Sequence, residues 1–197
     1  VGKYMYYSTD SYQRCVELIA PVGDVENLKI VNIPSSITKD GVKYTVNKVG
    51  EKAFYECKNL TSVTIPSSVT SIGEEAFSYC FSLTSVTIPS SVTSIGDWAF
   101  RKCSSLTSIN IPNSVTSIGY RAFENCEKLR VMILPQHITN IDELDIPNQV
   151  RIIRKDKADH SLGNNASYKK EEKKEEEEVV DNAVVETPLD YPGGEAA

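Results

Sequence analysis

Histidine, tryptophan and long apolar runs are scarce in this sequence of 197 residues. The only two histidines, His137 and His160, fall in a predicted turn and in a polar tail. Histidine-based metal sites and nucleophilic triads therefore lack the residues that they require. No apolar run approaches the ~20 residues that cross a bilayer, so the visible chain offers no candidate transmembrane segment.

Clusters of basic residues are also missing, and the formal net charge is −6. Binding to nucleic acid needs concentrated lysine and arginine, so we expect no nucleic-acid partner. Acidic pairs such as Glu74–Glu75 lie at predicted exposed positions with no cleft, and no glycine-rich phosphate loop precedes a helix. We therefore predict a protein that is not an enzyme and has no catalytic residue, cofactor or metal.

What the sequence does contain is a repeat. Three near-copies, Leu60–Ser82, Leu83–Ser105 and Leu106–Lys128, follow one another at a period of 23 residues, and a decaying copy begins at Leu129. Such a period is typical of solenoids. The apolar positions keep the same register in every copy, because each coil buries its apolar side only against the next coil.

Each copy contains two kinds of local pattern. In the first copy, Val63 and Ile65 alternate with polar residues, which predicts a short strand that Pro66 ends. A second extended stretch is expected over residues 69–72. Over residues 74–80 the apolar spacing becomes i, i+1, i+4 behind acidic residues, which predicts one or two helical turns.

The two ends depart from the repeat. An earlier copy over residues 28–59 carries an insertion in which Asp40–Gly41 predicts a hairpin, and residues 144–150 repeat only the strand half. Exposed terminal coils need capping. We therefore predict an N-terminal β-hairpin cap over residues 1–27 and a solenoid of about five coils over residues 28–153. Cys15 is expected in the core of the cap, with a free thiol as the alternative.

The shared pattern Ile-Pro-x-Ser-Val-x-x-Ile-Gly-x-x-Ala-Phe-x-x-Cys resembles the BspA-like leucine-rich-repeat surface proteins of bacteria, over about Leu28 to Ile153. The resemblance implies a leucine-rich-repeat solenoid, β-rich with short helical turns, of the right-handed α/β superhelix type. Members of that family are typically secreted or anchored at the surface of anaerobic bacteria and protozoa, and some are adhesins. The implied function is a non-catalytic, extracytoplasmic protein-binding module, either at the cell surface or secreted.

The sequence after Ile153 is charged and cannot form a core, so residues 154–197 are expected to be a mostly disordered tail or linker, with an acidic binding tail as the alternative. Its end, Thr187–Ala197, resembles the start of a TonB-type C-terminal domain. That resemblance implies a second possible function, a structural spacer or a periplasmic partner-binding segment attached to a TonB-like envelope protein. Val1 in place of Met is compatible with a removed signal peptide or with trimming.

Four cysteines are spaced one repeat apart: Cys57, Cys80, Cys103 and Cys126. Repeating positions form a line, and neighbouring helices would place the thiols about 8–10 Å apart. Such a line neither converges on zinc nor meets disulfide distances, so we predict small buried apolar residues.

Two surfaces compete for partner binding. One is the outward side of the strands, where the predicted ladder is Asn32, Thr64, Thr87 and Asn110. The other departs from the repeat consensus through five aromatic residues: Trp98, Tyr120, Tyr79, Phe81 and Tyr55. The aromatic set is the better candidate because tryptophan and tyrosine dominate binding energies.

Each surface also has a structural explanation. Threonine and serine suit a solvated sheet without any ligand, and the rings can pack sideways on one another. A contiguous aromatic patch would favour binding, and mutually buried rings would favour a spacer. The expected partner is a host extracellular or bacterial surface protein, bound by a monomeric chain.

Overall fold

The computed structural model describes residues 3–10, 14–22 and 28–155. Contacts divide the chain into two units, Val1–Lys157 and Ala158–Ala197, and all described residues belong to the first. The expectations for the acidic tail, His160 and the TonB-like segment lie outside the described residues. The domain limits at residues 27 and 153 remain predictions.

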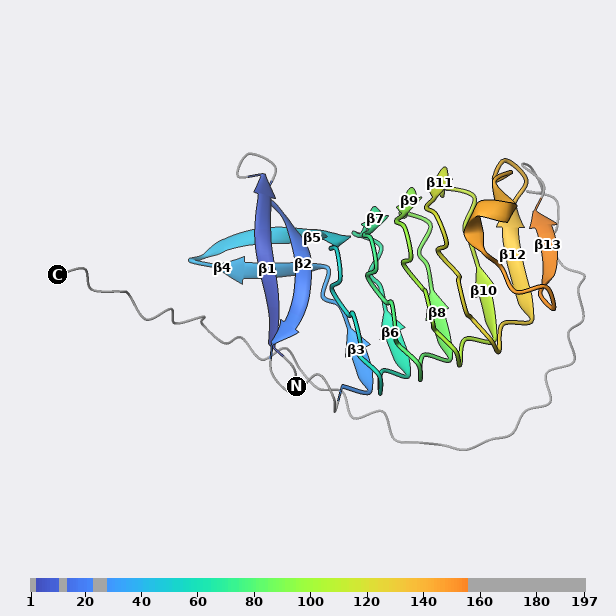
Figure 1. Cartoon of the computed structure of the whole chain (residues 1–197). Helices are drawn as coiled ribbons and strands as arrows, with labels where there is room; N and C mark the ends of the chain where they lie inside the picture. Colours follow the sequence, from blue (N-terminus) through green and yellow to red (C-terminus); the bar gives the residue numbers. More distant parts are fainter. Residues whose placement is uncertain (1–2, 11–13, 23–27, 156–197) are drawn as a thin grey trace, which may run out of the picture. The chain divides into compact units, whose positions relative to one another are not determined.

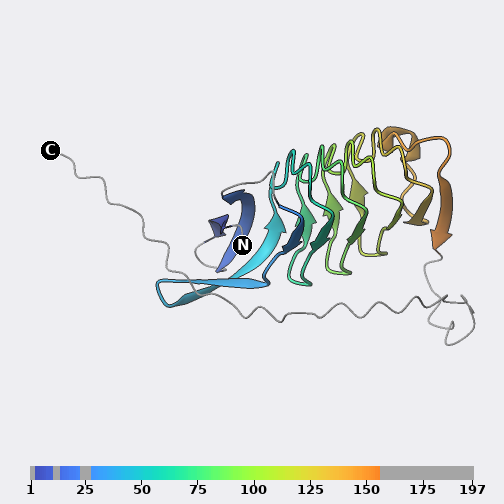
Figure 2. The same ribbon diagram turned by 90° about the horizontal axis from the view of Figure 1, so that it is seen from below.

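The described chain winds into a stack of coils, and each coil adds one strand to a parallel row (Figures 1 and 2). The row consists of two parallel three-stranded sheets. The first contains β3 (Ile30–Asn32), β6 (Ser62–Thr64) and β8 (Ser85–Thr87), and the second contains β10 (Ser108–Asn110), β12 (Val131–Pro135) and β13 (Arg151–Lys155). Val63 pairs with Val86, so the strand register equals the sequence period. The β-rich leucine-rich-repeat solenoid expected from the sequence is thus confirmed.

A second row of strands carries the Ser-Ile pairs of successive coils. It contains β7 (Ser71–Ile72), β9 (Ser94–Ile95) and β11 (Ser117–Ile118), which continue in parallel from the longer β5 (Val42–Val49). The serine side chains face away from the core and the isoleucines face inward, as the burial of Ile72, Ile95 and Ile118 shows.

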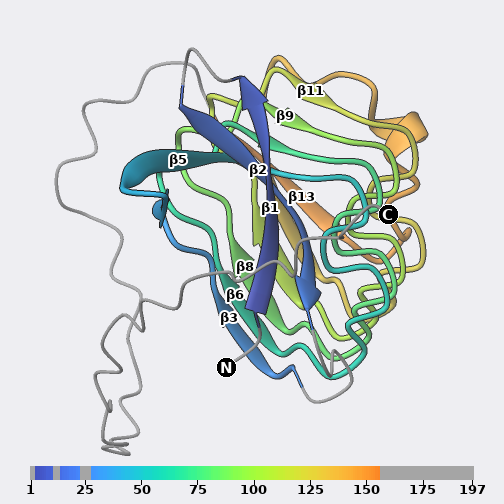
Figure 3. The same ribbon diagram turned by 90° about the vertical axis from the view of Figure 1, so that its left-hand side faces the viewer.

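A hairpin caps the N-terminal end of the stack. Strands β1 (Lys3–Asp10) and β2 (Cys15–Val22) are antiparallel, and β2 joins the second row by parallel pairing with β5. Figure 3 shows β1 and β2 in front of the coils when the stack is viewed from this end. Val16 and Leu18 are buried in the common core, so the hairpin closes it. Cys15, expected in that core, is only half-buried.

The insertion in the first copy forms the expected hairpin. Strand β4 (Ser36–Lys39) pairs antiparallel with β5 through Asp40 and Gly41, whose φ angles are 52° and 73°. Positive φ at both central residues defines the tight turn that asparagine-glycine and aspartate-glycine pairs favour.

The expected helical turns are hydrogen-bonded turns instead. Two residues in each coil have positive φ, at positions four apart: Lys52 and Glu56, Glu75 and Tyr79, Trp98 and Lys102, Arg121 and Asn125. An α-helix cannot pass through left-handed residues. Alternate N–H groups therefore point toward the next coil. In the first coil, Lys52, Phe54 and Glu56 donate to carbonyls of the next coil at 2.8–2.9 Å. Among the described residues the helical element is the 3-10 helix η2 (Ile141–Leu144).

A stack of four phenylalanines runs through the core. Phe54, Phe77, Phe100 and Phe123 are fully buried. Their ring centroids lie 5.2, 5.3 and 5.7 Å apart with interplanar angles of 6° or less. Each ring therefore contacts the same residue of the neighbouring coil, and the stack links all four repeats.

A column of glycines allows the backbones of adjacent coils to approach closely. A Cβ atom at Gly96 would lie 2.6 Å from the backbone nitrogen of Glu74 and 2.7 Å from the carbonyl carbon of Gly73. Gly50, Gly73 and Gly119 face similarly short contacts. The repeated glycine is thus required by the distance between coils.

Replacing Phe77 by alanine should lower the free energy of unfolding by about 3–5 kcal/mol, because the cavity would open between two stacked rings. Urea denaturation followed by circular dichroism measures the change. The matched control is Phe81→Ala on the surface, which should cost much less. Near-wild-type stability of Phe77→Ala would contradict the packing described here.

Replacing Gly96 by alanine should destabilise the protein by about 1–3 kcal/mol, because the new methyl group meets backbone atoms that cannot move independently of the stack. Thermal unfolding of this variant beside Ser94→Ala, an outward position two residues away, provides the comparison. An equal melting temperature for both variants would show that the coils tolerate a wider separation.

Candidate binding surface

Three of the predicted aromatic residues form one cluster on the turn side of the coils. The ring of Tyr79 lies 5.5 Å from the ring of Tyr55 and 5.9 Å from that of Phe81, measured between centroids. Two cations lie over the same ring, with the guanidinium carbon of Arg101 at 5.5 Å and Nζ of Lys102 at 4.6 Å. We call these five residues the Tyr79 cluster.

The other two predicted aromatic residues form a second group. The rings of Trp98 and Tyr120 meet edge to face, with centroids 5.9 Å apart and an interplanar angle of 84°. The guanidinium carbon of Arg121 lies 5.0 Å from the centroid of the Tyr120 ring. We call these three residues the Trp98 cluster.

The rings are neither scattered nor buried. Tyr120 is 45% exposed and Phe81 is 37% exposed. Trp98, Tyr55 and Tyr79 are half-buried. The rings do pack sideways on one another, and each cluster still presents apolar surface beside a cation. Their role in binding remains a prediction.

The backbone fixes the direction of these side chains. Trp98 occupies the first left-handed position of its coil, with φ of 50°. Tyr79 occupies the second left-handed position of the preceding coil, with φ of 63°. Their N–H groups donate to the carbonyls of Tyr120 and Arg101 in the next coil, at 2.9 and 2.8 Å. Other coils hold lysine, glutamate, arginine or asparagine at these positions in the same conformation. The coil geometry therefore imposes the left-handed conformation on whichever residue stands at these positions, aromatic or not.

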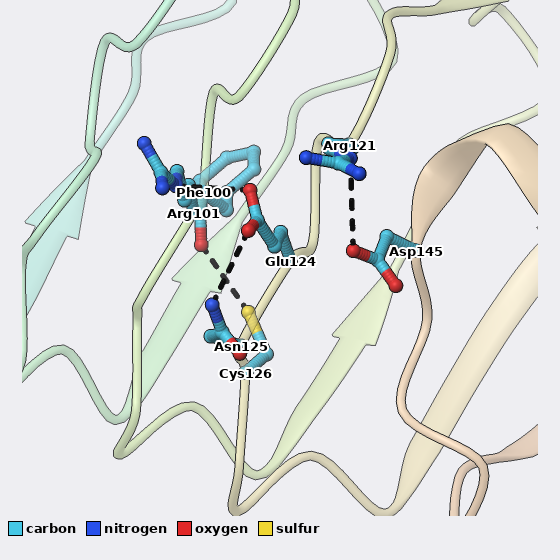
Figure 4. Close-up of polar contacts among 7 residues, drawn as sticks. All are labelled: Phe100, Arg101, Arg121, Glu124, Asn125, Cys126 and Asp145. Carbon is cyan, nitrogen blue, oxygen red and sulfur yellow. Dashed lines mark hydrogen bonds and ion pairs between the residues drawn. The ribbon is translucent and has the colours of Figure 1, made fainter.

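Ion pairs hold two of the cations in place. Nε of Arg101 lies 2.9 Å from Oε2 of Glu124, and Nε of Arg121 lies 3.9 Å from Oδ2 of Asp145 (Figure 4). The Arg101 contact is an ion pair rather than an aligned hydrogen bond, since neither atom has a hydrogen-bond partner. Arg101 is thus held closely by Glu124 of the next coil, whereas Arg121 and Asp145 form a long ion pair between exposed side chains.

Sequence reasoning missed these cations. Arg101 and Glu124 occupy the same position in consecutive copies, 23 residues apart. Stacked coils place such residues side by side, so comparing each position with its repeat neighbour would have revealed the pair.

The strand face offers small polar groups instead. Asn32, Thr64, Thr87 and Asn110 are all exposed, and the first three are paired in register across β3, β6 and β8. The amide oxygen of Asn110 accepts a hydrogen bond from Nζ of Lys155 at 2.7 Å. Asn32, Thr64 and Thr87 thus form a paired row, whereas Asn110 lies on β10 in the other sheet, and the four residues include no ring that could anchor a partner. Their role in binding remains a prediction.

Comparison with known proteins decides the family. Residues 27–149 match the model of the BspA type leucine rich repeat region, in six copies. The chain belongs to the BspA-type leucine-rich-repeat family. Leucine-rich-repeat domains of this type generally bind proteins and are not catalytic. No curated protein matches the sequence significantly.

Solved structures of bacterial leucine-rich-repeat proteins share the fold. A protein from Bacteroides capillosus is 31% identical with a TM-score of 0.55, covering 79% of this chain and 96% of that one. The leucine rich repeat protein of T. pallidum is 26% identical with a TM-score of 0.54, covering 77% and 83%. A protein from Eubacterium ventriosum, 22% identical with a TM-score of 0.52 over 78% and 45%, shows the fold alone.

The repeated cysteines of this BspA-type chain are buried thiols. Sγ of Cys80, Cys103 and Cys126 donates to the carbonyl of Phe54, Phe77 and Phe100, respectively, at 3.2–3.3 Å. None forms a disulfide, and the described residues contain no group of potential metal ligands. The separation of 8–10 Å expected from helix packing is wrong, because the coils are joined by backbone hydrogen bonds.

Burial makes these thiols weak acids. It raises the pKa of Cys57 to about 11 and that of Cys126 to about 12, and it raises the pKa of Cys80 and Cys103 well above the usual value. Thiolate is the nucleophile in cysteine chemistry, so these side chains are inert at neutral pH.

His137 has a structural role. Its Nε2 lies 2.6 Å from the carbonyl oxygen of Val115. The serines at the same position of earlier coils, Ser68, Ser91 and Ser114, donate to the matching carbonyls at 2.6–2.7 Å. Histidine therefore replaces a serine in a ladder of inter-coil hydrogen bonds.

Surface hollows are shallow. A groove of about 440 Å³ follows the Ser-Ile-Gly row, and its carboxylate, Asp97, accepts the N–H of Tyr120 at 2.7 Å through Oδ1.

No helix among the described residues is long and apolar enough to span a membrane.

At pH 8, Ellman's reagent should label Cys57, Cys80, Cys103 and Cys126 only as fast as the protein unfolds. Their neutral thiols stabilise the fold below the unfolded pKa of about 8.5, and this contribution is lost as the pH rises toward 11–12. All five cysteines should react in guanidinium chloride. Rapid labelling of a native Cys15→Ser variant would contradict this account.

Proposed function

We propose that this chain is a non-catalytic, extracytoplasmic protein-binding module of the adhesin-like kind, which binds its partner through the aromatic turn side. The observation that carries the proposal is the Trp98 cluster, in which two rings and one guanidinium lie together on adjacent coils. Tryptophan, tyrosine and arginine are the residues that most often dominate the energy of protein interfaces.

Preorganisation supports the choice of this side. Binding costs free energy for each side chain that must be ordered, so anchored groups lose less. The Trp98 ring packs edge to face on the Tyr120 ring, and the Arg121 guanidinium lies over the same Tyr120 ring. The Tyr79 cluster adds a second anchored group of rings and cations on the same turns.

The strand face is the weaker candidate. Its exposed ladder of asparagine and threonine provides little apolar area to remove from water. Asparagine and threonine also occur on solvated sheet faces that bind no ligand.

The partner that we propose is a host extracellular or bacterial surface protein, bound by a monomeric chain at the cell surface, in secreted form or in the periplasm. The family supports this proposal, because its surface-displayed members include adhesins.

The test is biolayer interferometry of the whole chain against a panel of extracellular-matrix and bacterial surface proteins. The Trp98→Ala Tyr120→Ala variant should bind at least about 30-fold more weakly, as expected for the loss of one strong anchor of about 2 kcal/mol. Thr64→Ala Thr87→Ala is the matched control on the strand face and should bind like the wild type.

Either of two results would contradict the proposal. Loss of binding in the threonine control alone would move the interface to the strand face. Absence of saturable binding across the panel would favour a structural spacer.

A further inference from the structure

Both ends of the described stack leave some apolar side chains partly exposed. At the N-terminal end, Val31 of β3 is fully buried, whereas Ile30 is 67% exposed and Leu28 is only partly buried. At the C-terminal end, Ile152 of β13 pairs with Met132, which is fully buried, yet Ile152 itself is only partly buried. Ile146 and Val150 of the last coil are also partly buried. The last coil thus leaves part of its apolar interior uncovered by described residues.

Strand β13 also has an open edge. It pairs with β12 on one side, and no described strand pairs with it on the other (Figure 1). An open edge presents unpaired N–H and C=O groups to any extended chain that approaches.

Side chains hold this edge in a fixed position. Nη1 of Arg154 donates to the carbonyls of Pro135 and Ile138, at 3.0 and 2.7 Å. Nζ of Lys155 donates to the amide oxygen of Asn110 at 2.7 Å. The strand is therefore ordered before any partner arrives, which lowers the cost of binding.

The charge of the edge selects a partner. Strand β13 has the sequence Arg-Ile-Ile-Arg-Lys, and neither β12 nor β13 contains an acidic residue, although the chain as a whole carries a net charge of −6. Arg130, whose carbonyl accepts the N–H of Arg151 at 2.8 Å, adds a further cation beside it. An acidic segment fits this surface.

We propose that β13 is a docking edge for an extended acidic peptide segment of a partner protein, which adds to the sheet as one more strand. Main-chain hydrogen bonds would supply affinity, and alternate side chains would supply specificity. One acidic residue would lie opposite Arg151, and a second would lie at the position opposite Lys155, whose ammonium also donates to Asn110. Apolar residues between them would cover Ile152 and Ile153, which is 37% exposed.

A second copy of this chain fits the edge poorly. Antiparallel pairing of two β13 strands about Ile153 would place Arg151 of each copy opposite Lys155 of the other. Like charges directly opposite each other destabilise a pair of strands.

The probe is the labelled peptide acetyl-Ser-Glu-Val-Val-Val-Glu-Ser-amide, whose palindromic order suits either strand direction. Its binding to the whole chain is measured by fluorescence polarisation, and the amide resonances of residues 151–155 locate it by NMR. Arg151→Glu should weaken binding at least about tenfold, since it reverses one of the facing charges. The peptide with lysine in place of both glutamates should bind the Arg151→Glu Lys155→Glu variant, in which both facing charges are reversed.

Controls separate the edge from other effects. Lys43→Glu makes the same charge change at the opposite end of the stack and should leave binding unchanged, as should Trp98→Ala Tyr120→Ala. N-methylation of all three valines should abolish binding, because successive N–H groups of a strand point to opposite sides and at least one of the three must face β13.

Three outcomes would overturn the proposal. They are no binding of the peptide to the wild type, an equal loss with Lys43→Glu, and a concentration-dependent dimer in analytical ultracentrifugation that Arg151→Glu dissociates. The last would assign the edge to a second copy. None of these results bears on the Trp98 cluster, so this proposal and the proposed function can fail separately.

Discussion

Hydrogen bonding between coils is the constraint on which the rest of the structure depends. Backbone groups join each coil to the next along both rows of strands and along the turns, where Phe54 donates to Ala76 and Phe77 to Ala99 at 2.8 Å. Parallel strands so joined lie ~4.8 Å apart. At that spacing only glycine fits where the backbones meet, and the phenylalanine rings stack face to face. The repeated Ile-Gly and Ala-Phe pairs follow from this one distance.

The same constraint separates variable from invariant positions within the chain. Residues that face the interior must match the coil above and the coil below, so they are copied from repeat to repeat. Residues on the turns and strands that face outward are free of this demand. The left-handed positions are the clearest case, because they accept lysine, glutamate, tryptophan or arginine without altering the coil. Recognition groups can therefore be exchanged while the frame remains rigid.

Much of the fold follows from the sequence alone. Alternation around Val63, the Asp40–Gly41 pair and the 23-residue period predict the strands, the hairpin and the stack correctly, because each has a local physical signal. The turns around Phe77 have no such local signal in the sequence. The spacing of Ala76, Phe77 and Cys80 fits a helix equally well, and the left-handed residues beside them are not glycines. The aromatic residues proposed for binding stand out in the sequence as departures from the repeat. The cations over the Tyr79 ring, Arg101 and Lys102, come from the next coil, so finding them needs the stacked register, whereas Arg121 directly follows Tyr120 in the chain.

The uniform spacing of the phenylalanine stack has a consequence for how such proteins change over time. Every internal interface joins the same residues, so a coil can be duplicated or deleted as a unit of 23 residues and the new junction is identical to the old ones. Recombination between near-identical copies would do this in a single event. The distance between the two ends is thus adjustable in steps of ~4.8 Å without any new packing solution.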